Sequence, residues 1–115
     1  MKFNQENLVA MFDGDEDIFL EIRDDFVSTY PEMVEAIVEA AKNQDHEKLH
    51  ISAHTMKGVL ATFCADELRE VAFEIEMMGK DNNLAGSVEK AEFLATEVQS
   101  LIEELKNFDT TKMAA

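Results

Sequence analysis

The residues of this chain best suited to chemistry are His54 and two neighbours, His50 and Lys57, which stand four residues before and three residues after it. Residues three and four apart lie on the same side of an α-helix, so a helix would bring these side chains together. An exposed imidazole is largely unprotonated near neutral pH and can act as a nucleophile. A lysine one turn away can donate a charge-assisted hydrogen bond to an anion on that imidazole. The cluster therefore indicates a nucleophilic histidine with a cationic neighbour.

The helix that must position this cluster is predicted over residues 46–63. Its apolar residues form a narrow seam with alternating spacings of four and three residues: Leu49, Ala53, Met56, Leu60 and Phe63. At about 100° per residue, His54 projects about 140° from the middle of this seam, so we expect its ring to face solvent.

Gly58 falls just beyond this outer side of the helix, where glycine costs about 1 kcal/mol relative to alanine. We interpret it as the place where the backbone of another protein approaches His54. The alternative is that a neighbouring helix of the same chain packs closely against it.

Acidic residues are absent from the sequence around the cluster. The chain has 25 Asp and Glu against 10 Lys and Arg, a formal net charge of −15, yet residues 49–65 include no acidic residue. Neighbouring carboxylates would repel a dianionic phosphoryl group, whereas Lys57 can bind its oxygens. The pattern therefore favours a histidine that holds a phosphoryl group.

The remainder of the chain predicts an all-α fold. It has four glycines and one proline, and its β-branched residues do not alternate with polar ones as strands would require. Apolar residues at helical spacing predict helices at residues 5–12, 16–30, 32–43, 46–63, 66–78 and 87–108. We expect an antiparallel up-down four-helix bundle with a short additional N-terminal helix, forming one domain over residues 1–115.

Polar residues and one proline mark the expected helix ends. Asn4 is predicted to cap the first helix, the Asp13-Gly14-Asp15 cluster to end it and cap the next, and Asp66 to cap a later one. Pro31 predicts a bend or a break in the helical segment around it. Two segments are expected to lie outside helices: a polar loop at 79–86 and a frayed tail at 109–115.

Composition excludes several classes of function. The net charge argues against nucleic acid and anionic membranes as partners. The single cysteine, Cys64, permits no internal disulfide and is typical of a reducing cytoplasm. No secretory signal or apolar stretch of about 18 residues is present. We expect a cytoplasmic monomer, and we expect a complete chain, although a domain excised from a hybrid kinase is the alternative.

The segment around His54 resembles the signature of histidine-containing phosphotransfer (HPt) domains, in which a helix carries His-x-x-Lys-Gly. The matching residues are the run Ala53-His54-Thr55-Met56-Lys57-Gly58, followed by Leu68, Ala72 and the Ile75-Glu76 pair. The chain length and the Tyr30-Pro31 step are also similar to the family, so the resemblance covers most of the chain. It implies that His54 is the phosphoacceptor, that Lys57 stabilises the phosphate and that Gly58 lets the partner dock.

One position departs from the family pattern. HPt domains often have glycine ten residues after the histidine, where this chain has Cys64. The departure leaves open the geometry of that helix end. A redox role for Cys64 is an alternative, although no basic residue adjoins it to lower its pKa.

The resemblance also implies a partner-dependent mechanism. The chain has no glycine-rich nucleotide loop, so the phosphoryl group must come from another protein and not directly from ATP. The implied partners are response-regulator receiver domains and, in addition, a hybrid sensor histidine kinase. The phosphoaspartate and Mg²⁺ of a receiver would meet the neutral imidazole for in-line attack, and this chain itself is expected to bind no cofactor or metal.

Apolar and small residues off the buried seams are candidates for partner docking, together with Gly58: His50, Ile51, Ala61, Phe73 and Met77. For Phe73, burial in the bundle core is an equally good interpretation.

The sequence is also consistent with three alternatives to a phosphoacceptor histidine. His54 could be an ordinary surface histidine without chemistry. The protein could be a non-catalytic adaptor that binds a receiver or a kinase without phosphotransfer. His46, His50 and His54, spaced four residues apart, could also bind a metal ion, although the sequence around them has few carboxylates to complete such a site.

Overall fold

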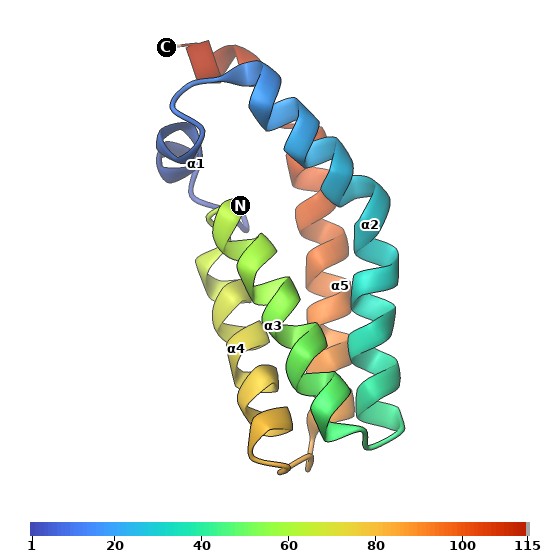
Figure 1. Cartoon of the computed structure of the whole chain (residues 1–115). Coiled ribbons are helices and arrows are strands. Elements are labelled where there is room, and N and C mark those ends of the chain that lie inside the picture. The colour runs from blue at the N-terminus through green and yellow to red at the C-terminus, as the bar shows by residue number, and fades with distance from the viewer. Residues whose placement is uncertain (115) are drawn as a thin grey trace.

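Four long helices lie side by side in the computed structural model, which describes residues 1–114, and a short fifth helix lies beside one end of them (Figure 1). The helices are α1 (Gln5–Met11), α2 (Glu16–Lys42), α3 (His46–Thr62), α4 (Asp66–Lys80) and α5 (Ser87–Lys106), followed by the 3₁₀ helix η1 (Thr110–Ala114). Residues 1–114 form no strand. The all-α prediction is confirmed, and short connections join the four long helices at alternating ends (Figure 1).

The apolar seam predicted for the central helix is the buried side of α3. Leu49, Ala53, Met56 and Leu60 have no exposed surface, and α3 packs most extensively against α4. At the end of α3, Phe63 is stacked on Phe26 of α2, with ring centroids 5.2 Å apart. Burial of this seam turns the opposite side of α3 to solvent, which is the side that His54 occupies.

The predicted caps of the first two helices are confirmed. The side chain of Asn4 accepts a hydrogen bond from the Asn7 N–H at 2.9 Å, and that of Asp15 accepts one from the Ile18 N–H at 3.1 Å. Asp66 is not a cap, contrary to the prediction: Ala65 occupies that position without a side-chain bond, and Asp66 is the first residue of α4. An acidic residue in the first turn still interacts favourably with the helix dipole.

The ends of the first four helices share one backbone motif, in which a non-glycine residue has positive φ. These residues are Asp13, Gln44, Cys64 and Asn82. At the end of α3, Cys64 has φ of 56°, its N–H donates to the carbonyl of Ala61 at 3.1 Å, and the Ala65 N–H donates to Leu60 at 3.0 Å. This is the Schellman arrangement, in which glycine is favoured because it has no Cβ. The backbone at Cys64 therefore has the conformation that glycine adopts most easily.

Pro31 does not break the helix that contains it. Helix α2 runs without interruption from Glu16 to Lys42, and its ribbon changes direction near the middle (Figure 1). Proline removes one i to i−4 hydrogen bond from the helix. The hydroxyls of Ser28 and Thr29 both donate to the Asp25 carbonyl at 2.9 Å, a contact that favours a bend in the same part of the helix. Of the bend or break predicted at Pro31, the break is wrong, because packing on α3 and α5 holds both halves of α2 in one helix.

Two segments expected outside helices are helical in part. Gly79 and Lys80 belong to α4, so the predicted loop at 79–86 begins later than expected. The segment 109–114, expected to fray, contains η1, which contacts α2 and buries Met113 completely. The last residue of the predicted tail, Ala115, lies outside the described residues.

Candidate functional site

His54 projects from α3 with 64% of its side chain exposed, as its angular position predicted. Its ring does not stand alone, because Nδ1 lies 3.0 Å from Oε2 of Glu76 on α4. Glu76 follows Ala72 by one helical turn on α4, and both residues are buried against α3. The packing of α3 on α4 thus places a carboxylate directly beside the histidine.

Glu76 was named from the sequence only as part of the family resemblance, with no role assigned to it, and the structure places it in the site. Its side chain is only 9% exposed, and its second oxygen, Oε1, lies 2.7 Å from Lys57 Nζ as an ion pair without hydrogen-bond alignment. Its backbone carbonyl lies 3.4 Å from His50 Nδ1. The segment around His54 is free of carboxylates in sequence but not in space. The expectation of a site without acidic groups was therefore wrong, because α4 supplies one from 22 residues further along the chain.

The Glu76 carboxylate is ionised at neutral pH. Burial raises the pKa of Glu76, but the contacts from Lys57 and His54 lower it by more, so the pKa lies below that of an ordinary glutamate. An ionised carboxylate can only accept hydrogen bonds. The Nδ1 atom of His54 must therefore be the donor, and the neutral ring then has its lone pair on Nε2, the nitrogen away from Glu76.

Lys57 is half-buried and occupied on two sides. Besides its ion pair with Glu76, its ammonium lies 5.1 Å from the ring centre of Phe73, a cation–π distance. The predicted basic cluster of His50, His54 and Lys57 is thus present, and Glu76 lies at its centre.

The two glycines near the site have opposite surroundings. A Cβ added to Gly58 would meet no atom within 4 Å, so no other helix within residues 1–114 packs against that position. A Cβ added to Gly79 would lie 2.6 Å from His50 N and 2.7 Å from His46 O. The close helix packing that was considered for Gly58 occurs instead at Gly79, where α4 meets the backbone of α3.

The other predicted docking residues are exposed to different degrees. Ile51 is 63% exposed and Phe73 is 41% exposed, so the core does not absorb Phe73. His50, Ala61 and Met77 are partly exposed. Arg69 and Glu70, which sequence reasoning did not select, line a shallow depression on α3 and α4 together with Lys57, Gly58, Ala61 and Phe73.

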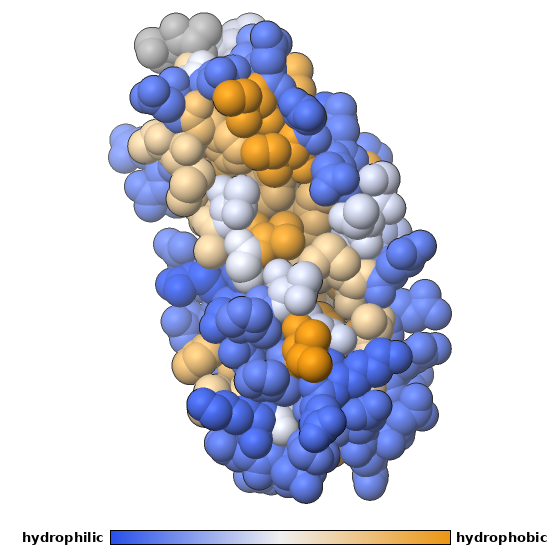
Figure 2. Space-filling model, in the orientation of Figure 1, coloured by the Kyte–Doolittle hydropathy of each residue, from blue (hydrophilic) through white to orange (hydrophobic). Residues whose placement is uncertain are grey.

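Exposed apolar residues also occur on the first half of α2. In Figure 2 separate hydrophobic patches lie over α2 and α3, between polar borders. Ile18 and Ile22 of α2 are 48% and 38% exposed, and Ile22 lines a small depression with Val59 of α3. Neither isoleucine was among the docking residues predicted from the sequence, so this part of the exposed surface was missed.

The geometry does not support the alternative chemistry at the histidines or at the cysteine. Within residues 1–114, no three His, Cys, Asp or Glu side chains are arranged to hold a metal ion, and His46, His50 and His54 are no exception. Cys64 is buried, and burial together with the charge of Asp66 raises the pKa of its thiol. A raised thiol pKa disfavours the reactive thiolate.

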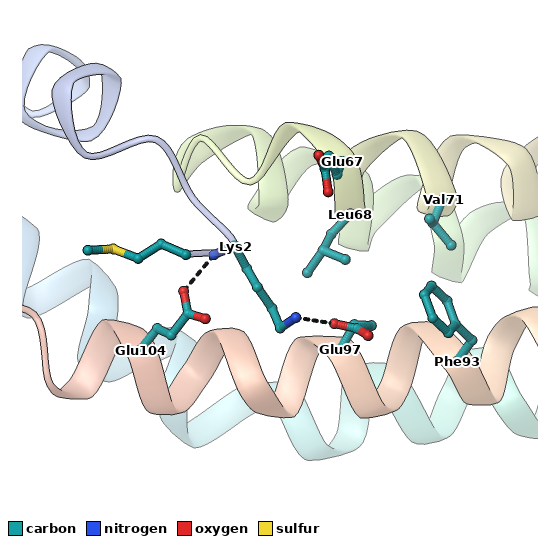
Figure 3. Close-up of a pocket in the computed structure, with 8 residues that line it drawn as sticks. Lys2, Glu67, Leu68, Val71, Phe93, Glu97 and Glu104 are labelled. Atoms are coloured by element: carbon teal, nitrogen blue, oxygen red, sulfur yellow. Dashed lines mark hydrogen bonds and ion pairs between the residues drawn. The ribbon is translucent and has the colours of Figure 1, made fainter.

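A third depression, between α4 and α5, contains none of the residues predicted for the histidine site or its docking surface. The N-terminal segment crosses it, where Lys2 forms an ion pair with Glu97, and the Lys2 N–H donates to Glu104 at 2.6 Å (Figure 3). Leu68, Val71 and Phe93 line the same depression. These contacts tie the start of the chain to α5, on a different side of α4 from His54.

No helix within residues 1–114 combines the length and apolarity needed to cross a membrane.

The fold and the site together define a class of protein. It is an all-helical domain with an exposed histidine that is oriented by a buried carboxylate and flanked by lysine and glycine. The comparison with family models identifies the class: the Hpt domain model matches residues 21–108, and the chain belongs to this family. Hpt domains act in histidine phosphotransfer within phosphorelays and interact with receiver domains and kinases. Searches of curated proteins and of solved structures gave no match.

Proposed function

We propose that this protein is a phosphorelay intermediate built on an antiparallel up-down four-helix bundle. Nε2 of His54 accepts a phosphoryl group from the phosphoaspartate of one receiver domain and passes it to the aspartate of another. The observation that supports this proposal best is the contact between His54 Nδ1 and Glu76, because it leaves Nε2 unprotonated on a ring that is largely exposed.

The transfer needs only a nucleophile and a docking surface from this chain. The Nε2 lone pair attacks phosphorus in line with the aspartyl oxygen, the bond from phosphorus to that oxygen breaks, and its electron pair stays on the aspartate carboxylate. Charge neutralisation on the phosphoryl oxygens comes from the Mg²⁺ expected in the receiver. The reverse steps on a second receiver complete the relay.

Lys57 serves this reaction in one of two ways. It stabilises the phosphoryl oxygens directly if its ammonium moves from Glu76 Oε1, which the flexible lysine side chain permits. In its present position it acts through Glu76, because it helps to keep that carboxylate ionised and in contact with His54.

The docking surface surrounds His54 and has an open centre. Gly58 has free space above it, Ile51 and Phe73 are exposed, and His50, Ala61 and Met77 complete the border. The exposed isoleucines Ile18 and Ile22 extend this surface onto α2. A receiver that binds here buries apolar side chains around the phosphoryl group and excludes water from it. The monomeric state and the cytoplasmic location stay predictions from composition.

Incubation with a radiolabelled, phosphorylated receiver tests the proposal. We expect label that is stable in base and labile in acid, as phosphohistidine is, and that is lost in His54→Gln. His46→Gln is the matched control, since that histidine lies on the same helix two turns away and should leave labelling unchanged. A receiver that binds the protein without labelling it would support the adaptor function instead, and label that persists in His54→Gln would refute the assignment of His54.

A further inference from the structure

We propose that the depression between α4 and α5 is a second docking site, which binds a non-helical segment of a partner protein. That segment carries a lysine or arginine beside a large apolar side chain. The site lies on a different side of α4 from His54, so the proposal does not rest on the phosphotransfer function. Residues 1–4 of the chain itself reach into the depression and act as an internal competitor (Figure 3).

The apolar part of the depression is built around Phe93 of α5. Of the eight phenylalanines, all within residues 1–114, six are buried and one, Phe73, belongs to the histidine site. The eighth is Phe93, which is 51% exposed and lines the depression together with Leu68 and Val71 of α4 (Figure 3). Exposed aromatic side chains are enriched where proteins bind partners. The depression therefore offers a place for an apolar side chain of a partner.

The charged part of the depression has an excess of carboxylates. Glu67 of α4 and Glu97 and Glu104 of α5 line it, and Lys2 is the one basic side chain among its lining residues within 1–114. Contact with Glu97, together with the charges of Glu104 and Glu67, raises the pKa of the Lys2 ammonium, so all three carboxylates act on this cation. Three carboxylates around one ammonium favour the approach of a basic segment.

The two helices do not supply the cation that this depression holds. Three residues before Phe93, Lys90 of α5 forms an ion pair with Glu74 of α4, so the helix pair balances its own charges there. At the depression the basic side chain comes instead from Lys2, which belongs to the N-terminal segment. The place of a cation is thus left to a segment from outside the helix pair.

The N-terminal segment indicates what kind of chain fits. The Lys2 N–H donates to Glu104 Oε1 at 2.6 Å, and the Lys2 ammonium pairs with Glu97 (Figure 3). The next residue, Phe3, is buried against Phe108, with ring centroids 5.7 Å apart. A basic residue next to an aromatic one, in a non-helical backbone, therefore already lies at the edge of this depression.

The Lys2 side chain can be displaced without unfolding the protein. The side chains of Lys2 and Glu97 are 30% and 24% exposed, and ion pairs that water reaches contribute little to stability. Phe3 can stay buried while the long, flexible lysine side chain turns to solvent. A cation of the partner then takes the place of Lys2 at Glu97, and the apolar side chain beside it packs on Phe93.

Titration of the full chain with a synthetic peptide, followed by the ¹⁵N–¹H NMR signals of the backbone amides, tests the proposal. The probe is an acetylated Gly-Lys-Phe-Leu-Lys-Gly amide, and the control peptide has glutamine in place of both lysines. We expect the lysine peptide to shift the amides of residues 67–71 and 93–104, to bind more tightly than the control peptide and to bind equally well to His54→Gln. No shift at millimolar peptide, or shifts that gather around His54 instead, would overturn the proposal.

Removing the internal competitor should increase affinity. Lys2→Ala is expected to bind the lysine peptide about two- to five-fold more tightly, the range for one exposed ion pair. Lys48→Ala is the matched control, because it removes the same charge from an exposed position at the start of α3. Equal affinities of the two variants would show that Lys2 does not compete for the depression.

The binding residues are then assigned in the Lys2→Ala protein, where the competitor no longer contributes. Glu97→Gln should weaken binding about two- to five-fold, and Phe93→Ala about ten-fold. Glu92→Gln removes the same charge as Glu97→Gln from an exposed position about 140° around α5, and it should leave affinity nearly unchanged. Circular dichroism checks that each variant is folded. A folded Glu97→Gln or Phe93→Ala that binds like its parent, or an equal loss in Glu92→Gln, would refute the docking site.

Discussion

Replacing Gly79 with alanine is expected to destabilise the protein, whereas the same replacement at Gly58 is expected to stabilise it. Both glycines lie inside helices, α4 and α3, so each substitution recovers about 1 kcal/mol of helix propensity. They differ in what the new methyl group meets. A Cβ at position 58 would meet no atom within 4 Å, whereas a Cβ at position 79 would lie 2.6 to 2.9 Å from three backbone atoms of α3.

The magnitude at Gly79 follows from those distances. The nearest contact, to His50 N at 2.6 Å, is about 0.8 Å short of ordinary van der Waals separation, and backbone atoms cannot rotate away. The helices must therefore separate at this point, and α3 and α4 are the most extensively packed pair of helices within residues 1–114. Overpacking of this kind costs about 1–3 kcal/mol, and after the gain in propensity we expect a net loss of about 1–2 kcal/mol. At Gly58 we expect a net gain of up to about 1 kcal/mol.

Urea denaturation followed by circular dichroism at 222 nm measures both changes in the free energy of unfolding. The separation of α3 and α4 in Gly79→Ala should also lengthen the contact between Glu76 and His54, so phosphorylation by a receiver should slow in a protein that remains folded. Gly58→Ala should be at least as stable as the wild type but accept label more slowly, because the methyl group enters the docking surface. A Gly79→Ala protein of wild-type stability, or a destabilised Gly58→Ala, would refute this reasoning.

Three further predictions concern other features of the chain. Gln44 is exposed and has φ of 53°, so Gln44→Gly should relieve backbone strain and raise the free energy of unfolding by about 0.5–1 kcal/mol, a gain that Gln44→Ala should not give in the same urea titration. The folded-state pKa of Glu76 is lowered, so its stabilising contribution is present above the pKa of an unfolded glutamate and is lost as pH falls through the folded value; stability measured from about pH 5 downward should fall less steeply in Glu76→Gln. The buried thiol of Cys64, whose pKa is raised, should react slowly with an aromatic disulfide reagent in buffer and rapidly in urea, and rapid reaction of the folded protein would contradict its burial.

Local sequence patterns predicted most of the helices correctly. Helical spacing located the seam from Leu49 to Phe63, and cap residues located the starts of α1 and α2, because these signals depend on neighbours within one or two turns. The errors lie where tertiary packing decides. Helix α2 continues through Pro31, and the C-terminal segment folds as η1 because Met113 becomes buried in the core. No local pattern in the sequence predicts that a helix continues through Pro31 or that the residues of η1 pack on α2.

The position of His54 on the outer side of its helix was determined by sequence alone, since the angle between a residue and an apolar seam is a property of one helix. Its electrostatic surroundings were not. The segment without carboxylates suggested an isolated basic cluster, and only the packing of α4 on α3 placed Glu76 between His54 and Lys57. Gly79 allows that approach, yet in sequence it looked like the start of a loop. Distance between helices is a property of the packed pair, and it decides which nitrogen of His54 is free.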